Sequence, residues 1–151
     1  MIVRLNFDGA KVDIGKLVMT SIGVAGYVDG VSAPAITIGE VVGYGTSNTA
    51  EWTGLCKALE FVVQLSKEQK QVMDVSILGD SQLVVYQFIG KYKVRQPHLK
   101  EYYDKAKALF NSLHTEQRRR ISVRWIPREK NKEADKLAGD ALKSFLAQNK
   151  I

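Results

Sequence analysis

The stretch that decides the fold is residues 17–44, LVMTSIGVAGYVDGVSAPAITIGEVVGY. It lacks helical periodicity and is rich in Val, Ile, Thr and Gly, which is typical of strands. Its centre holds Asp29-Gly30, a pair that tolerates positive φ and favours a hairpin turn. We therefore expect antiparallel strands over Leu17–Val28 and Ala33–Tyr44, preceded by a strand over Ile2–Asp8.

After residue 45, helical patterns alternate with short apolar strands. The predicted helices are Thr49–Ser66, Ser81–Ile89, His98–Leu113 and Lys132–Ala147, and the predicted strands are Met73–Leu78 and Ile121–Ile126. The order βββαβααβα indicates an α/β fold with a five-stranded mixed sheet and helices on both faces. With no repeat or linker in the sequence, we expect a single domain over residues 1–151.

The composition is that of a basic, soluble domain. The 151 residues carry a formal net charge of +6, which favours polyanionic partners such as nucleic acid but can also serve solubility alone. The one cysteine, Cys56, rules out an intrachain disulfide and is expected in the core. No stretch is long and apolar enough to cross a membrane, so we expect a cytoplasmic protein without a membrane partner. We also expect a monomer.

Four carboxylates stand at special places in the predicted order. Asp8 and Asp80 end strands, Glu51 opens the first helix, and Asp135 lies in the first turn of the last helix. Each has a purely structural alternative. Asp8 could begin a turn, Glu51 could complete a capping box with Asn48, Asp80 could cap a helix, and Asp135 could complement the helix dipole.

Their combination favours a metal site. If the strands that end at Asp8 and Asp80 are parallel neighbours, both carboxylates lie at the edge where open sheets bind ligands. Glu51 and Asp135 begin helices that could pack over that edge. Carboxylates so close repel one another unless a cation neutralises them, and oxygen ligands suit Mg²⁺ or Mn²⁺. Two such ions about 4 Å apart can bind both oxygens of a phosphoryl displacement.

At these residues the sequence resembles the type 1 ribonuclease H family, and within it the compact branch of archaea and some bacteria. The matching motifs are Phe7-Asp8-Gly9, Thr46-Ser-Asn-Thr-Ala-Glu51, Gly79-Asp80-Ser81-Gln82 and Asn131-Lys-Glu-Ala-Asp135-Lys-Leu-Ala138. The resemblance implies an endonuclease that cuts the RNA strand of an RNA–DNA hybrid and leaves 5′-phosphate and 3′-hydroxyl ends. It also implies that the four carboxylates hold two Mg²⁺ or Mn²⁺ ions when substrate is bound.

The resemblance also implies substrate contacts. Ser47, Asn48 and Gln82 look like the residues that read the minor groove and the ribose 2′-hydroxyls, although Asn48 could simply cap a helix. Thr46 looks like the threonine that contacts a DNA phosphate. We also assign Asn131, in the last motif, to substrate binding.

The sequence departs from the family pattern in two loops. Ala10–Lys16 replaces the glycine-rich turn that many members carry, which puts contacts from that loop in doubt. The larger bacterial enzymes have an extra basic helix where this chain has only Gly90–Gln96. Its Lys91, Lys93 and Arg95 could partly replace that helix as substrate contacts, or form a solvated charge run.

A third departure concerns catalysis. Familiar members carry a histidine in the loop before the last aspartate, and this chain has Arg128 in that region. Arginine stays protonated and cannot act as a general base, but it could bind a phosphate bidentately. The alternative is an exposed loop arginine without a role in the reaction.

The sequence leaves two other functions open. An exonuclease of the same superfamily would normally show an acid at position 10, where this chain has Ala10. The stronger alternative is a nucleic-acid-binding module that has lost catalysis, or a ribonuclease H-like domain associated with a reverse transcriptase. The presence of all four acids argues against loss of catalysis.

Overall fold

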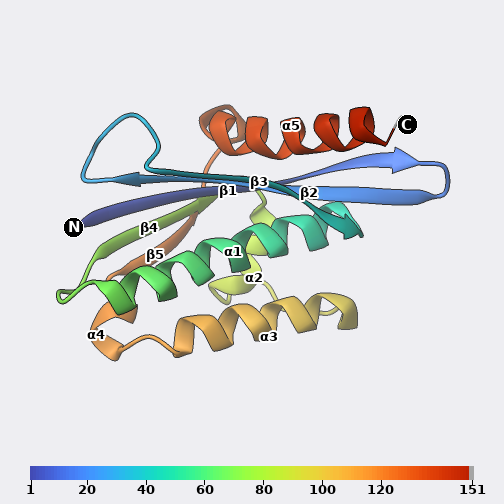
Figure 1. Cartoon of the computed structure of the whole chain (residues 1–151). Coiled ribbons are helices and arrows are strands. Elements are labelled where there is room, and N and C mark those ends of the chain that lie inside the picture. Colours follow the sequence, from blue (N-terminus) through green and yellow to red (C-terminus); the bar gives the residue numbers. More distant parts are fainter. Residues whose placement is uncertain (150–151) are drawn as a thin grey trace.

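A computed structural model describes residues 1–149 and contains one mixed sheet (Figure 1). Its strands are β1 (Ile2–Ile14), β2 (Leu17–Val28), β3 (Ile36–Tyr44), β4 (Asp74–Gly79) and β5 (Ile121–Trp125). They lie in the order β3-β2-β1-β4-β5. The β1–β2 and β2–β3 pairs are antiparallel, whereas β1–β4 and β4–β5 are parallel. The predicted five-stranded mixed sheet is confirmed.

Helices cover both faces of this sheet, as predicted. The helices are α1 (Ser47–Glu68), α2 (Gln82–Phe88), α3 (Pro97–Asn111), the short α4 (Thr115–Arg118) and α5 (Lys132–Gln148), with a 3₁₀ turn at Arg128–Lys130. Figure 1 shows α1, α2 and α3 on one side and α5 alone on the other. The sequence pattern did not predict α4.

The main core lies between the sheet and helix α1 and continues between α1 and α3. Alternate residues of β1, Val3, Leu5 and Phe7, face this side and are almost fully buried. They join Trp52 and Leu59 of α1 in one apolar cluster. Cys56 is buried in the same cluster, as expected, and burial raises the pKa of its thiol to about 11.

The predicted end of the first strand is wrong. Strand β1 continues past Asp8 to Ile14, and the turn lies at Gly15, whose φ is +61°. Gly9 is glycine for a different reason. A Cβ there would lie 2.7 Å from the carbonyl carbon of Ala50, so the start of α1 can approach β1 only because that atom is missing. The segment Ala10–Lys16 is therefore mostly strand and hairpin, not a loop.

The second connection behaves largely as predicted. Asp29 and Gly30 have φ values of +53° and +75°, the left-handed conformation that this pair tolerates. However, β3 begins at Ile36, three residues after the predicted Ala33, so the connection is longer than a tight hairpin.

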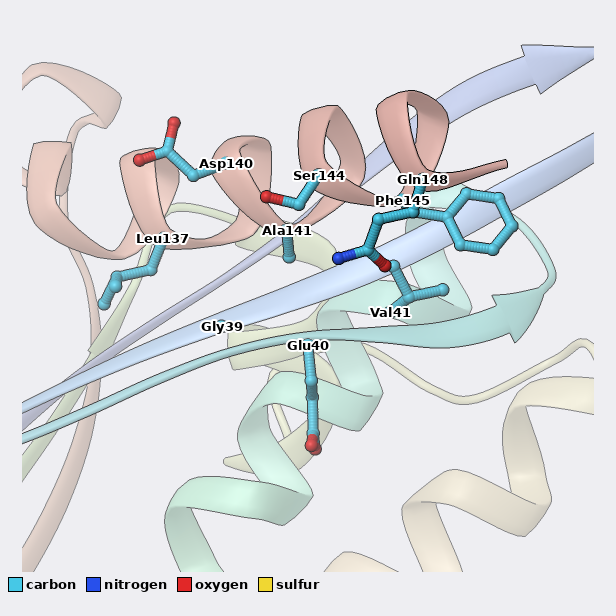
Figure 2. A pocket seen from close by; sticks show the side chains of 9 residues that line it. All are labelled: Gly39, Glu40, Val41, Leu137, Asp140, Ala141, Ser144, Phe145 and Gln148. Atoms are coloured by element: carbon cyan, nitrogen blue, oxygen red, sulfur yellow. The ribbon is translucent and has the colours of Figure 1, made fainter. Parts of the chain in front are cut away.

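Helix α5 packs closely on β2 and β3 because small residues face it. A Cβ at Gly23 would lie 2.1 Å from the carbonyl oxygen of Ala134, and one at Gly39 would lie 2.7 Å from that of Leu137. Figure 2 shows the groove between α5 and β3, with Leu137 and Ala141 on its sheet side. The groove contains none of the predicted site residues.

No helix within residues 1–149 is long and apolar enough to span a membrane.

Candidate active site

The sheet topology brings Asp8 and Asp80 together. Strands β1 and β4 are parallel neighbours, and Phe7 is paired with Gly79. Asp8, within β1, and Asp80, the first residue after β4, therefore lie side by side where β4 ends. The parallel pairing on which the predicted metal site depends is confirmed.

Glu51 joins these aspartates from helix α1. The backbone N–H of Gly9 donates to Glu51 Oε1 at 3.0 Å and to Asp8 Oδ1 at 2.9 Å. Carboxylate oxygens of Asp8, Glu51 and Asp80 all lie within 4.8 Å of one another. We call these three residues the acidic cluster.

Burial and mutual repulsion make the acidic cluster costly to ionise. Burial, together with the nearby charge of Asp80, raises the pKa of Asp8 from its usual 3.8 to about 7. Burial and Asp8 also raise the pKa of Glu51 well above its usual value. The pKa of Asp80 is raised by burial too, although a hydrogen bond from Asn131 opposes that shift.

The structural alternatives for three of the acids are wrong. Helix α1 is capped by Thr46, whose side chain accepts from the Thr49 N–H, so neither Glu51 nor Asn48 forms the cap. Helix α2 is capped by Ser81, whose hydroxyl accepts from the Val84 N–H at 3.2 Å. Asp8 lies within a strand and begins no turn. These three acids thus neither cap a helix nor begin a turn.

Asp135 and Arg128 lie at the outer side of the acidic cluster. Asp135 is not one of the three tightly grouped carboxylates, although its proximity contributes to the raised pKa of Asp8. Arg128 Nη2 lies 3.7 Å from Asp135 Oδ1, and the Arg128 side chain is 80% exposed. Its guanidinium therefore keeps most of its donors free for an anion.

Asn131, predicted to contact substrate, is buried in the structure. Asn131 is only 1% exposed, and its amide nitrogen donates to the Phe7 carbonyl at 2.8 Å and to Asp80 Oδ2 at 3.2 Å. Its oxygen accepts from Asn6 Nδ2 at 3.2 Å. Asn131 is a positioning residue that joins the start of α5 to both acidic strands. The signal that could have shown this is Asn6, a polar residue on the same face of β1 as Asp8.

Sequence reasoning also missed Trp125. Its indole N–H donates to the Asp80 carbonyl oxygen at 3.1 Å, and the neighbouring Ile126 N–H donates to the Gly79 carbonyl at 2.9 Å. Strand β5 therefore fixes the end of β4 that carries Asp80. A tryptophan beside the motif was visible in the sequence, but no spacing rule links it to Asp80.

The predicted substrate contacts lie on three surface segments. Thr46 and Ser47 are exposed at the start of α1, where Asn48 is half-buried, and Gln82 is exposed at the start of α2. The remaining contacts, Lys91, Lys93 and Arg95, are exposed in the segment between α2 and α3. All seven side chains therefore reach the surface.

The acidic cluster fits a hard divalent cation. Glu51 Oε2 is buried and has no hydrogen-bond partner among the described residues. A buried acceptor without a partner is costly, and a cation would satisfy it while cancelling the repulsion among the carboxylates. The cluster offers only oxygen ligands and lacks the thiolate and imidazole groups that zinc prefers, so it favours Mg²⁺ or Mn²⁺ over zinc.

Comparison with known proteins agrees with this geometry. The family described as reverse transcriptase-like matches residues 35–141. The structure of the N-terminal ribonuclease H domain of Rv2228c from Mycobacterium tuberculosis is 33% identical, with a TM-score of 0.76, and the match covers 93% of this chain and 98% of that one.

The chain belongs to the type 1 ribonuclease H family.

Two further family members extend the comparison. LC11-RNase H1, isolated from compost and crystallised with an RNA/DNA hybrid, has a TM-score of 0.81 and 29% identity, covering 95% of this chain and 99% of that one. Ribonuclease HI of Halobacterium salinarum is 32% identical over 69% of this chain and 47% of its own length. The full-length mycobacterial protein, named bifunctional protein Rv2228c, is 39% identical over 68% of this chain. That match spans only 26% of the mycobacterial protein.

Proposed function

We propose that this domain is an endoribonuclease that hydrolyses the RNA strand of RNA–DNA hybrids, with two Mg²⁺ or Mn²⁺ ions bound when substrate is present. The observation that carries the proposal is the acidic cluster, in which three carboxylates lie close together and one of their buried oxygens, Glu51 Oε2, has no hydrogen-bond partner among the described residues. Membership of the ribonuclease H family supports the reaction class.

Asp8, Glu51 and Asp80 would hold the ions, with Asp135 completing the set from the first turn of α5. Divalent ions at such a site stabilise the charge that develops on the scissile phosphate and make an attacking water more acidic. The chain's own contribution is to keep the carboxylates in place. Asn131 and Trp125 fix Asp80, and the Gly9 N–H orients both Asp8 and Glu51.

Arg128 would bind a phosphate oxygen beside the site. Its guanidinium is largely exposed, and Asp135 holds it near the acidic cluster. Because it stays protonated, it would contribute charge and hydrogen bonds and would not remove a proton. The products would carry a 5′-phosphate and a 3′-hydroxyl.

Specificity for RNA would come from the exposed polar residues at the helix starts. Ser47, Asn48 and Gln82 would contact 2′-hydroxyls in the wide minor groove of the hybrid. Thr46, which caps α1, and the segment with Lys91, Lys93 and Arg95 would contact phosphates of the DNA strand.

The test is cleavage of an end-labelled RNA–DNA hybrid, with a DNA duplex of the same sequence as control. We expect cleavage of the hybrid alone, in Mg²⁺ or Mn²⁺ but not in chelator, and none by the Asp80→Asn variant. Hybrid binding without cleavage in either metal would identify an inactive binding module instead. Equal cleavage of both duplexes would contradict the assigned specificity.

A further inference from the structure

The face of the sheet that carries α5 is only partly covered. Helix α5 packs on β1, β2 and β3, and within residues 1–149 Figure 1 shows no helix over the same face of β4 and β5 near the N-terminus. Arg4, Tyr27, Ser76, Leu78 and Arg124 line a hollow on this uncovered part. Their strand pairings place them on one face, since Arg4 is opposite both Tyr27 and Ser76, and Leu78 is opposite Arg124.

The positive charge of this hollow is not neutralised. Arg4 and Arg124 are exposed, and neither forms an ion pair with any carboxylate in residues 1–149. The arginines stand on strands two positions apart, so their backbones are separated by about 10 Å across the sheet. A protein that covered this face would bury two unpaired cations, which is strongly unfavourable unless it supplied matching anions.

One arginine is already held flat. The Arg4 guanidinium lies over the Tyr27 ring, 4.0 Å from its centroid. The outer face of a guanidinium stacked in this way is free to stack on a further planar group, while its N–H groups can bind a phosphate. An exposed arginine and an aromatic ring on a sheet form the kind of platform on which unpaired bases stack.

The hollow continues toward the acidic cluster. A second hollow shares Arg4, Tyr27 and Leu78 with the first and extends over Asn6. Its rim carries two lysines, Lys130 and Lys132, and two glutamates, Glu129 and Glu133. Asn6 donates to Asn131, which in turn donates to Asp80. A single residue, Asn131, therefore connects the lining of the combined groove to the acidic cluster.

We propose that this groove binds a single-stranded nucleic acid segment, separately from the surface that takes the hybrid. Charge complementarity selects a polyanion, and the stacked arginine selects unpaired bases, because a duplex hides its base faces. A strand that leaves a hybrid bound at the acidic cluster could follow the groove, but the binding itself does not depend on the proposed nuclease activity.

The test measures the affinity of the whole chain for a fluorescent 12-nucleotide oligothymidylate, in chelator, by anisotropy. Arg4→Ala/Arg124→Ala should weaken binding by about tenfold or more, since loss of a single stacking contact has effects of that size. Lys16→Ala/Lys67→Ala, which removes two exposed positive charges elsewhere, is the matched control and should change affinity by less than about twofold. The charge-preserving Arg4→Lys/Arg124→Lys should fall between them because it loses the planar groups.

Thermal melts check that the variants are folded, and cleavage of a blunt-ended hybrid by Arg4→Ala/Arg124→Ala should match the parent. Equal oligothymidylate affinity in this variant and the lysine control would overturn the proposal, as would absence of binding by the parent. Loss of hybrid cleavage in the arginine variant would also overturn it, because the groove would then be part of the hybrid surface. A parent that binds the single strand but cuts no hybrid would contradict the nuclease activity and leave this groove standing.

Discussion

Strand β1 and helix α1 meet in two regions whose contacts have opposite effects on the stability of the folded state. In the core, Leu5 and Leu59 are fully buried members of one apolar cluster, so each contact favours the folded state. Where β4 ends, the same two elements bring Asp8 and Glu51 together with Asp80, and burial and repulsion raise the carboxyl pKa values. The first region provides the stability that holds the second in a costly arrangement. Stability and function are thus separable although they share their elements.

Substitutions that change only one of the two regions test whether stability and function are separable. Glu51→Gln removes a charge that we expect to bind metal but keeps the size of the side chain. Turnover on the hybrid should fall by at least about 100- to 1000-fold, the usual loss when one electrostatic group of a catalytic site is removed. The thermal midpoint in chelator should not fall. Steady-state cleavage rates and melts of the same preparation check both statements, and near-parental turnover would remove Glu51 from the site.

The opposite result is expected in the core. Leu59→Ala leaves a cavity beneath the sheet and should lower the free energy of unfolding by about 2–5 kcal/mol. Turnover at a temperature where the variant remains folded should stay close to that of the parent, because the acidic cluster is unchanged. Urea unfolding and cleavage assays measure the two effects. A loss of turnover without a loss of stability would show that the two regions are not separable.

A smaller effect is expected at the outer side of the site. Arg128→Ala should reduce turnover by about tenfold, which corresponds to one charge-assisted hydrogen bond to the substrate, with no change in the thermal midpoint. Arg128→Lys should recover part of that loss because it retains the charge. If Arg128→Ala has parental kinetics, the residue is an exposed loop arginine without a role in the reaction.

Features that depend on local patterns could be predicted from the sequence, whereas contacts between residues far apart in the chain could not. Strand and helix periodicity reflects which side chains face the core, so the five strands followed from local patterns. The parallel pairing of β1 with β4 was only a condition of the predicted site, and the structure supplies it. The length of β1 could not be predicted in this way, because Asp8-Gly9 has the sequence of a turn. In the structure Gly9 lies within the strand and allows α1 to approach, a contact between residues far apart in the chain. Helix α4 is only four residues long and has no recognisable period.

The same limit applies within the site. Its carboxylates were predicted because the sequence pattern placed them at strand ends or in the first turns of helices, although β1 continues past Asp8. Asn131 was assigned to substrate because its motif lies beside the site. Its burial depends on hydrogen bonds with Asn6 and Phe7, which precede it by more than 120 residues. Trp125 was missed for a similar reason, because its contact with Asp80 exists only when β4 and β5 pair.

The raised pKa of Asp8 makes the stability of the folded protein depend on pH. The pKa of Asp8 in the folded protein is about 7, above the usual 3.8 that holds in the unfolded chain. The native state therefore binds the extra proton, and the stability that this contributes is present at low pH and is lost as pH rises through 7. Asp8→Asn cannot ionise, so in chelator its advantage over the parent should grow between pH 5 and pH 8, reaching on the order of 1 kcal/mol. Melts across that pH range check this, and an advantage that shrinks with rising pH would contradict the raised pKa.

The most direct test of the central claim, that the acids form one cation site, is a set of thermal melts at pH 8 of the parent and Asp8→Asn, each in chelator and in excess Mg²⁺. In chelator the variant should melt above the parent, because it relieves the repulsion within the acidic cluster. Mg²⁺ should raise the midpoint of the parent by mass action and that of the variant by less, since one ligand is lost. A variant that melts below the parent in chelator, together with no Mg²⁺ shift in either protein, would contradict the account.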